Sequence, residues 1–242
     1  MKTSIQRSIV ALSHNVPIRA LLTGPPGVGK GMTAKLLSEE HNCALHKMSC
    51  HDGMTPTDVV FNISVGGNNQ VRYDESGLVT AFRESNHGKI VLLIDEIDKT
   101  RPRVEDLLLH ILEEFTISLP GGEIVKGEAK NLIIVVTSNG RRQLREETLR
   151  RLFPRITISF PTNREEIEIL EEHGVPREKA IPLLKLAGEL RKVDAFKAPS
   201  YVELAWLFHA VQAGSPKDIC EGILWKNGPV PRIEWNWYKA LK

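Results

Sequence analysis

The feature that most constrains the fold is residues 18–41, IRALLTGPPGVGKGMTAKLLSEEH, where a short apolar run leads through a glycine loop into a helical pattern. GPPGVGK matches the phosphate-binding loop GxxxxGK, which requires a strand before it and a helix after it. Such a loop wraps a phosphate with its backbone N–H groups, and the following helix directs its positive end at the same anion. The pattern predicts a nucleotide site in which Lys30 reaches the β- and γ-phosphates. Its predicted residues are Gly24, Pro25, Pro26, Gly27, Val28, Gly29, Lys30, Gly31 and Met32.

The loop departs from the usual pattern at one position. Gly31 stands where a Ser or Thr hydroxyl normally binds Mg²⁺. Thr33 lies two residues further along the predicted helix, about 200° around its axis, so it should not point at the same ion. Because Mg²⁺ usually keeps several waters, a water could take the place of the missing hydroxyl. The sequence leaves the way in which the metal is held open.

Polar side chains end two further apolar runs. IVLLID, residues 90–95, ends in Asp95 and is followed by Glu96, and NLIIVVTSN ends in Asn139. Ligands bind at the carboxyl ends of parallel strands, so these groups should meet the glycine loop at one edge of a sheet. Asp95 suits Mg²⁺, directly or through water, and Glu96 could polarise an attacking water. The alternative, that Asp95 and Glu96 only begin a charged turn, is disfavoured by the loop upstream.

The remaining pattern predicts an α/β fold. Five apolar runs alternate with helical segments, which is typical of a five-stranded parallel sheet flanked by helices. The runs cover residues 18–24, about 43–50, 90–95, 131–139 and 155–160, and a helix with one apolar stripe covers 104–115. Two Gly-Gly pairs, at 66–67 and 121–122, predict hairpins. We expect an α/β core over 1–161, helices over 162–226 and a tail over 227–242.

Composition and charge favour no nucleic-acid, membrane or disulfide-rich class of protein. The chain of 242 residues has 32 Lys and Arg against 30 Asp and Glu, so nothing demands nucleic acid or an anionic membrane as a partner. No apolar run approaches the roughly 18 residues of a membrane span, and the N-terminus lacks a signal-peptide pattern, so a cytoplasmic location is expected. Three cysteines form no disulfide framework, and the stretch HNCALHKMSCH matches no zinc spacing.

Two long stretches resemble a known family. GLVTAFRESNHGKIVLLIDEIDKTRPRVEDLLLHILEEFTISLPGGEIV and NLIIVVTSNGRRQLREETLRRLFPRITISFP are similar to AAA+ ATPases, above all the MoxR-like and dynein-related (helix-2-insert) branch. The resemblance covers roughly residues 15–170. It implies a Walker A loop at 24–31, a Walker B pair at Asp95 and Glu96, a sensor 1 at Asn139, and ATP and Mg²⁺ as cofactors. The hairpins correspond to insertions that face a ring pore, and the helical region to the lid domain.

LRRLFPR resembles the arginine-finger segment of the same family, in which an arginine reaches the γ-phosphate held by a neighbouring subunit. Arg151 is the first choice, with Arg150 and Arg155 as alternatives; a solvated basic surface is the other interpretation. A finger that acts across subunits implies a homo-oligomer, expected as a hexameric ring. The sensor 2 arginine of the lid is replaced by Ser200 and Tyr201, so Arg191, Lys192 or Lys197 are possible substitutes.

Three functions stay open at this point. The favoured one is a ring ATPase that remodels or assembles an unidentified protein partner, a chaperone-like activity. The second is a structural or switching subunit that binds ATP or ADP with weak or no hydrolysis, because Gly31 lacks a hydroxyl. The third, a nucleic-acid loader or motor, is disfavoured by the near-neutral charge. Trp235 and Trp237 in the tail are interpreted as packing anchors, or else as part of a docking peptide.

Overall fold

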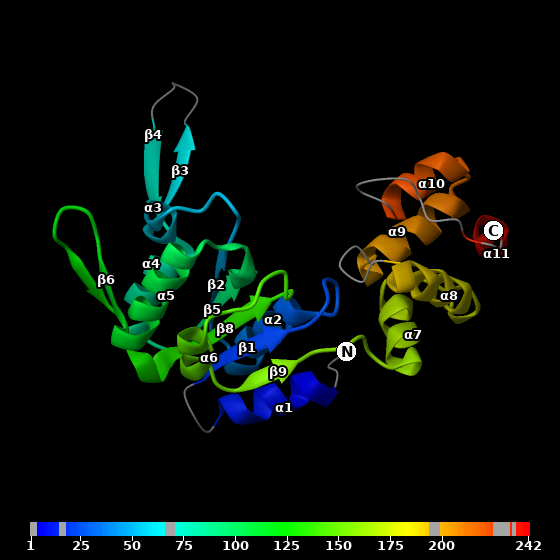
Figure 1. Ribbon diagram of the computed structural model, residues 1–242. Coiled ribbons are helices and arrows are strands. Elements are labelled where there is room, and N and C mark those ends of the chain that lie inside the picture. Colours follow the sequence, from blue (N-terminus) through cyan, green and yellow to red (C-terminus); the bar gives the residue numbers. More distant parts are fainter. Residues whose placement is uncertain (1–3, 15–17, 66–70, 194–198, 225–232, 234–235) are drawn as a thin grey trace. The chain divides into compact units, whose positions relative to one another are not determined.

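The computed structural model describes residues 4–14, 18–65, 71–193, 199–224, 233 and 236–242. They form two compact units. The α/β unit comprises Lys2–Gly24 and Lys30–Ile158, and the helical unit comprises Met1, Pro25–Gly29 and Ser159–Lys242. The sequence-based boundary at 161 falls close to this division, and each unit has its own hydrophobic core. Figure 1 shows the strands of the α/β unit and the helices of the other unit.

The α/β unit is built on a five-stranded sheet, in the order β2-β5-β8-β1-β9. All neighbouring strands are parallel, which confirms the predicted fold class. The last strand ends three residues earlier than expected. Phe160 and Pro161 lie beyond it, and a proline has no N–H for the ladder. The strands are β1 Arg19–Thr23, β2 Ala44–Ser49, β5 Ile90–Asp95, β8 Leu132–Ser138 and β9 Arg155–Thr157.

Burial explains the central position of β5 and β8. Every residue of β8 is buried, and so are the first five residues of β5, as expected for strands covered on both faces. Helices α2 (Lys30–His41) and α4 (Gly77–Ser85) both pack against β5, and α5 (Pro102–Glu114) buries the predicted stripe. Besides α4, the sequence analysis does not predict the helices α1 (Ser4–Ser13), α3 (Pro56–Val60) and α6 (Glu146–Arg151).

Both predicted hairpins form in the α/β unit. One pairs β3 (Phe61–Val65) with β4 (Val71–Glu75), and its Gly66 and Gly67 lie outside the described residues. The other pairs β6 (Thr116–Ser118) with β7 (Ile124–Lys126) around a turn in which Gly121 and Gly122 have positive φ. Both project from the same end of this unit (Figure 1). Two 3₁₀ turns, η1 (Ile97–Lys99) and η2 (Ala129–Asn131), complete it.

The helical unit contains α7 (Asn163–Glu172), α8 (Arg177–Val193), α9 (Tyr201–Gln212), α10 (Lys217–Leu224) and α11 (Trp237–Leu241). Ser200 and Glu203 form the predicted capping box of α9. Trp237 and Leu241 lie in the core with Leu183 and Leu204, so Trp237 is a packing anchor. Trp235 lies outside the described residues. The tail therefore packs within the helical unit, at least over α11.

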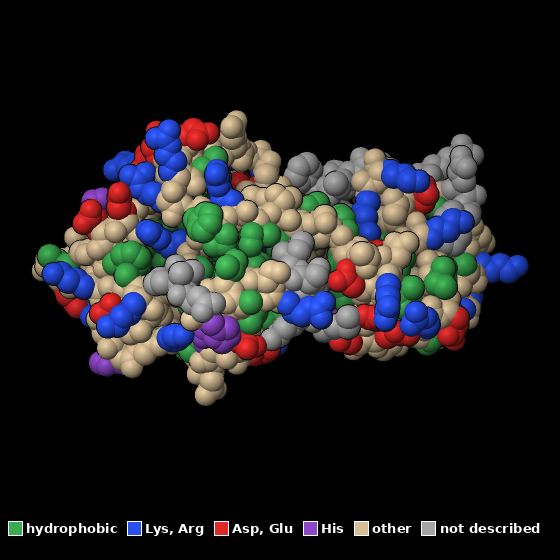
Figure 2. All heavy atoms as spheres, turned by 90° about the horizontal axis from the view of Figure 1, so that it is seen from below, with side chains coloured by type: hydrophobic (Ala, Val, Ile, Leu, Met, Phe, Trp, Pro, Cys, Tyr) green, Lys and Arg blue, Asp and Glu red, His purple; other side chains and the backbone are tan. Residues whose placement is uncertain are grey.

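Basic and acidic side chains mix on the surface. On the face drawn in Figure 2, Lys and Arg lie interspersed with Asp and Glu. Within the described residues, no helix is long and apolar enough to cross a membrane. All three cysteines carry free thiols. Burial, together with the charges of Asp95, Asp98 and Glu96, raises the pKa of the Cys50 thiol to about 12, so it stays protonated at neutral pH.

Candidate nucleotide site

The glycine loop has the backbone that its sequence requires. Gly24, Gly27 and Gly29 all have positive φ, a conformation that side chains disfavour. A Cβ on Gly24 would lie 2.0 Å from the carbonyl oxygen of Ile158, so no larger residue fits there. The loop leads from β1 directly into α2, whose first residue is Lys30. The predicted strand, loop and helix are thus present. Val28 is buried and Met32 is exposed.

Lys30 is buried at the start of α2. Its Nζ donates a hydrogen bond of 2.7 Å to the carbonyl oxygen of Gly24, so the ammonium is folded back over the loop. Burial lowers its pKa, and the charges of Asp95, Asp98 and Glu96 oppose that effect. The predicted phosphate-binding lysine therefore lies in the field of three carboxylates.

Asp95 is held by two donors at the end of β5. Thr137 Oγ1 donates to its Oδ1 over 2.6 Å, and Lys47 Nζ lies 2.7 Å from its Oδ2. Burial alone would raise the pKa of this carboxyl, but the hydrogen bonds from Lys47 and Thr137 and the charge of Lys30 outweigh it and lower the pKa. Asp95 is therefore ionised at neutral pH. The sequence analysis identified neither Lys47 nor Thr137, although a threonine in the apolar run 131–139 was a usable signal.

Glu96 and Asn139 meet as their strand-end positions suggested. Asn139 Nδ2 donates to Glu96 Oε1 over 2.6 Å, and Lys99 Nζ pairs with the other carboxylate oxygen. The backbone N–H of Glu96 donates to Thr137 Oγ1 at 2.8 Å. Glu96 itself has a left-handed backbone, with φ 59° and ψ 47°, which costs a non-glycine residue about 1 kcal/mol or more. Strain of this kind is common where a side chain must be aimed.

A buried carboxylate missed by the sequence analysis fixes the loop that carries Asn139. Asp98 is only 3% exposed, and it accepts the backbone N–H groups of Asn139 at 3.1 Å and of Arg141 at 2.9 Å. Charge-assisted hydrogen bonds of this type are about twice as strong as neutral ones. Asp98 therefore ties the turn after β5 to the end of β8.

The segment 145–151 is tied to α5. Glu105, which is fully buried on α5, accepts the hydroxyl of Thr148 and the N–H of Arg145, and pairs with Arg142. On α6, Arg151 makes a two-pronged contact with Glu113 through Nε at 2.9 Å and Nη2 at 3.3 Å. Arg150 and Arg155, the alternative candidates, are exposed. The first-choice arginine is thus held by its own chain.

The candidate sensor residues of the helical unit are engaged within that unit. Arg191 Nη1 donates to Glu166 Oε1 at 2.7 Å, and its guanidinium lies 3.7 Å from the ring centre of Phe160. Tyr201 donates to the same Glu166 oxygen at 2.9 Å. Lys192 pairs with Glu189, Ser200 caps α9, and Lys197 lies outside the described residues. This arrangement gives Arg191 a structural role inside the unit.

The residues present fit a divalent cation held in part by water. Asp95 is ionised and supplies a carboxylate oxygen, which is a preferred ligand of Mg²⁺. Gly31 supplies no side-chain oxygen. A Cβ there would lie 3.8 Å from Leu93 Cδ2, an ordinary contact, so the space for a Ser or Thr exists. A cation at this site would be bound mainly by phosphate oxygens and water, and by Asp95 in competition with Lys47.

Comparison with known proteins gives a matching family model and several similar proteins. The family model described as AAA domain (dynein-related subfamily) matches residues 19–155. The chain is 28% identical over 189 residues to protein NorQ of Paracoccus denitrificans, covering 75% of this chain and 67% of NorQ. It is 24% identical over 213 residues to chaperone MoxR1 of Mycobacterium tuberculosis, covering 86% of this chain and 53% of MoxR1. Chaperone ClpB of Enterococcus faecalis is 31% identical over 164 residues, covering 64% of this chain and 18% of ClpB.

Solved structures share the fold at low identity. A RuvB P216G mutant of Thermotoga maritima is 18% identical with a TM-score of 0.58, covering 91% of this chain and 66% of that one. NtrX of Brucella abortus, solved in complex with ADP, is 16% identical with a TM-score of 0.51, covering 74% of this chain and 41% of that one. The chain spans about a fifth of ClpB and about half of MoxR1.

Proposed function

The chain belongs to the dynein-related subfamily of AAA domains, and from this we propose that it binds ATP with Mg²⁺ and hydrolyses ATP to remodel or assemble a protein partner. The observation that carries the proposal is the contact between Asn139 Nδ2 and Glu96 Oε1, beside the hydrogen bond from Thr137 to Asp95. The ends of two neighbouring strands, β5 and β8, deliver these groups to one edge of the sheet, where α/β proteins bind their ligands.

Each residue has a role in the proposed reaction. The loop N–H groups and Lys30 would bind the β- and γ-phosphates. Glu96 would orient the attacking water, and Asn139 would hold the Glu96 carboxylate toward the γ-phosphate. Thr137 fixes both the Asp95 carboxylate and the Glu96 backbone. Bound Mg²⁺ would offset phosphate charge, and Asp95 would hold it directly or through water.

We further propose a homo-oligomer, expected as a hexameric ring, in which Arg151 acts on the neighbouring subunit's nucleotide. In the described chain Arg151 is held by Glu113, so this contact would have to open on assembly. An arginine that acts in this way is worth about a thousandfold in rate. Arg151→Ala should therefore abolish most turnover of the oligomer, whereas Arg164→Ala, at an exposed position on α7, should not. Equal rates in the two variants would remove Arg151 from the mechanism.

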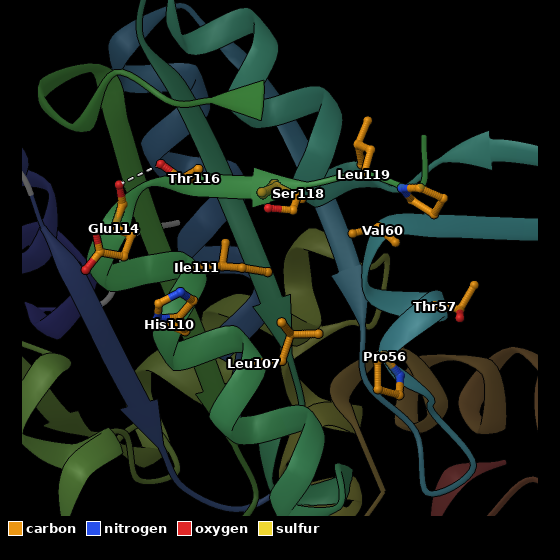
Figure 3. Close-up of a pocket in the computed structure, with 12 residues that line it drawn as sticks. Pro56, Thr57, Val60, Leu107, His110, Ile111, Glu114, Thr116, Ser118 and Leu119 are labelled. Carbon is orange, nitrogen blue, oxygen red and sulfur yellow. Dashed lines mark hydrogen bonds between the residues drawn. The ribbon is translucent and has the colours of Figure 1, made fainter. Parts of the chain in front are cut away.

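The two hairpins support a protein partner. Tyr73 on β4 is 62% exposed and Ile124 on β7 is 59% exposed, so each hairpin presents a large apolar side chain to solvent. Between α3, α5 and β6 lies a cleft of about 500 Å³, into which Leu107, Ile111 and Val60 project (Figure 3). This surface would contact the remodelled protein. A cytoplasmic location, expected from the sequence, belongs to the same proposal.

The test is a steady-state ATPase assay on the purified oligomer. Glu96→Gln should lower kcat by about a hundredfold or more, since general-base groups contribute at least that much. Glu178→Gln, an exposed position on α8, is the matched control and should behave as the wild type. Absent turnover in the wild type, or equal turnover in Glu96→Gln, would refute hydrolysis at this site.

Gly31 favours a second candidate function, a subunit that binds ATP or ADP as a switch and hydrolyses it slowly. Gly31→Thr restores the usual hydroxyl, and the nearest atom to the new Cβ, at 3.8 Å, leaves room for it. A large gain in turnover would show that the native site is attenuated. Unchanged turnover would show that the native loop already holds its metal. The net charge of +2 gives no comparable support to a nucleic-acid loader.

A further inference from the structure

Lys47 is the residue whose position the proposed reaction does not explain. It lies on β2, the strand beside β5, and its Nζ is 2.7 Å from Asp95 Oδ2. Because Thr137 occupies Oδ1, both oxygens of the proposed metal-binding carboxylate already have donors from the protein. The Lys47 side chain is 51% exposed, so its ammonium can leave Asp95 without disturbing the core.

The fold directs Lys47 at Asp95. In the β2–β5 ladder Lys47 pairs with Leu93 and Ser49 pairs with Asp95, so Lys47 precedes Asp95 by one pleat on the neighbouring strand. The start of α4 packs closely against the backbone at Lys47. A Cβ on Gly77 would lie 2.4 Å from the Lys47 carbonyl oxygen, so only glycine permits this approach. A four-carbon stem from this fixed point reaches the carboxylate.

The positive charges of the three lysines in the site offset the negative charges of its three carboxylates. Lys47 pairs with Asp95, Lys99 pairs with Glu96, and Lys30 lies in the field of both. Asp98 is used by the N–H groups of Asn139 and Arg141. A divalent cation that approaches Asp95 Oδ2 would therefore compete with the Lys47 ammonium for that oxygen.

A second observation, independent of Lys47, also indicates that the chain holds Mg²⁺ weakly. Gly31 removes the hydroxyl that normally binds Mg²⁺, although there is space for it. One usual ligand is thus missing and the other is engaged by a cation of the chain. We propose, on the basis of the nucleotide site above, that Lys47 competes with Mg²⁺ for Asp95, so that ATP or ADP binds with little dependence on the divalent cation. Lys47 is in this sense a specificity-determining residue for the metal.

The expected size of the effect follows from exposure. A half-exposed ion pair is worth little in water, so its removal should change metal affinity by about fivefold at most. Gly31 removes one usual ligand of Mg²⁺, and Lys47 engages the other, so the two effects are on different ligands of the same ion. Gly31→Thr and Lys47→Met should therefore each strengthen Mg²⁺ binding, and the double variant should combine both gains.

Calorimetric titration of the full chain with ADP tests the proposal without using turnover. The quantity is the ratio of the Kd in EDTA to the Kd in MgCl₂. For the wild type this ratio should stay within about threefold, and in Lys47→Met it should rise by about fivefold. Loss of the free Mn²⁺ signal in electron paramagnetic resonance, with ADP present, should show the same gain in metal affinity.

Two variants control for charge and fold. Lys130→Met removes an exposed lysine at η2, before the amino end of β8, and should leave the ratio at the wild-type value. Lys47→Arg keeps the positive charge and should also keep a low ratio. A large ratio in the wild type that is unchanged in Lys47→Met would overturn the role of Lys47 while leaving the nucleotide site intact. Absence of ADP binding in both buffers would instead refute the nucleotide site itself.

Discussion

The two halves of the site are built differently. The glutamate side, formed by Glu96, Asp98 and Asn139, is closed by hydrogen bonds between two strand ends, and Asp98 and Asn139 are buried. On the metal side, formed by Gly31, Lys47 and Asp95, the loop offers no hydroxyl, and one of the two partners of the carboxylate is a half-exposed lysine. Buried, fully paired networks hold one geometry, whereas exposed ion pairs exchange easily. The water-orienting part is therefore rigid and the metal-holding part adjustable.

Asp98→Ala is expected to have the largest effect, and it tests whether the glutamate side is held rigidly. It leaves the backbone N–H groups of Asn139, which is buried, and of Arg141 without their acceptor, at a cost of about 3 kcal/mol in the free energy of unfolding. Urea denaturation at fixed protein concentration measures it. Asp52→Ala, at an exposed position, should change the free energy by less than about 0.5 kcal/mol. If the two variants were equally stable, the glutamate side would not be rigid.

Asn139→Ala should have the next largest effect. Loss of the amide that holds Glu96 should lower kcat by about a hundredfold, as when one preorganised donor is removed, while the Kd for ADP stays nearly constant. A steady-state assay measures kcat, and calorimetric titration measures the Kd for ADP. Asn62→Ala on β3, an exposed asparagine, serves as the control. A proportional loss of ADP affinity would mean that Asn139 binds nucleotide instead.

Thr137→Val acts on both sides at once, because the hydroxyl donates to Asp95 and accepts from the Glu96 backbone. We expect about a tenfold loss of kcat and a loss of about 1–2 kcal/mol in the free energy of unfolding. Thr137→Ser keeps the hydroxyl and should retain most of both. The same loss in the serine variant would show that packing of the methyl group, and not the hydrogen bonds, is what matters.

Lys99→Met should have the smallest effect and gives the most direct comparison with Lys47→Met. Both substitutions remove a lysine from a carboxylate, on the glutamate side and the metal side respectively. Lys99→Met should change kcat by about fivefold at most and leave the Mg²⁺ dependence of ADP binding as it is. A change in Mg²⁺ dependence equal to that of Lys47→Met would dissolve the distinction between the two sides.

Much of this site follows from local pattern. The glycine loop needs positive φ at fixed spacings, and the apolar runs 90–95 and 131–139 are typical of central parallel strands, whose ends meet at one edge. The residues missed are those whose role depends on partners distant in the sequence. Asp98 resembles any acidic residue of a turn, and Lys47 resembles a surface lysine of an edge strand. The roles of Asp98 and Lys47 can be recognised only when the register between the strands is known.

The sequence by itself determined the α/β class, the loop and the identity of the groups at the strand ends, because these depend on spacing along one segment. Only the tertiary structure decided which groups touch: Asn139 with Glu96, Asp98 with two N–H groups, and Lys47 with Asp95. The physical reason is that a hydrogen bond depends on distances of a few tenths of an ångström between atoms 40 to 50 residues apart, set by strand order and pleat. Gly31 in the loop raises the question of how Mg²⁺ is held, and the structure adds Lys47, on the strand β2 beside β5, to the groups that decide it.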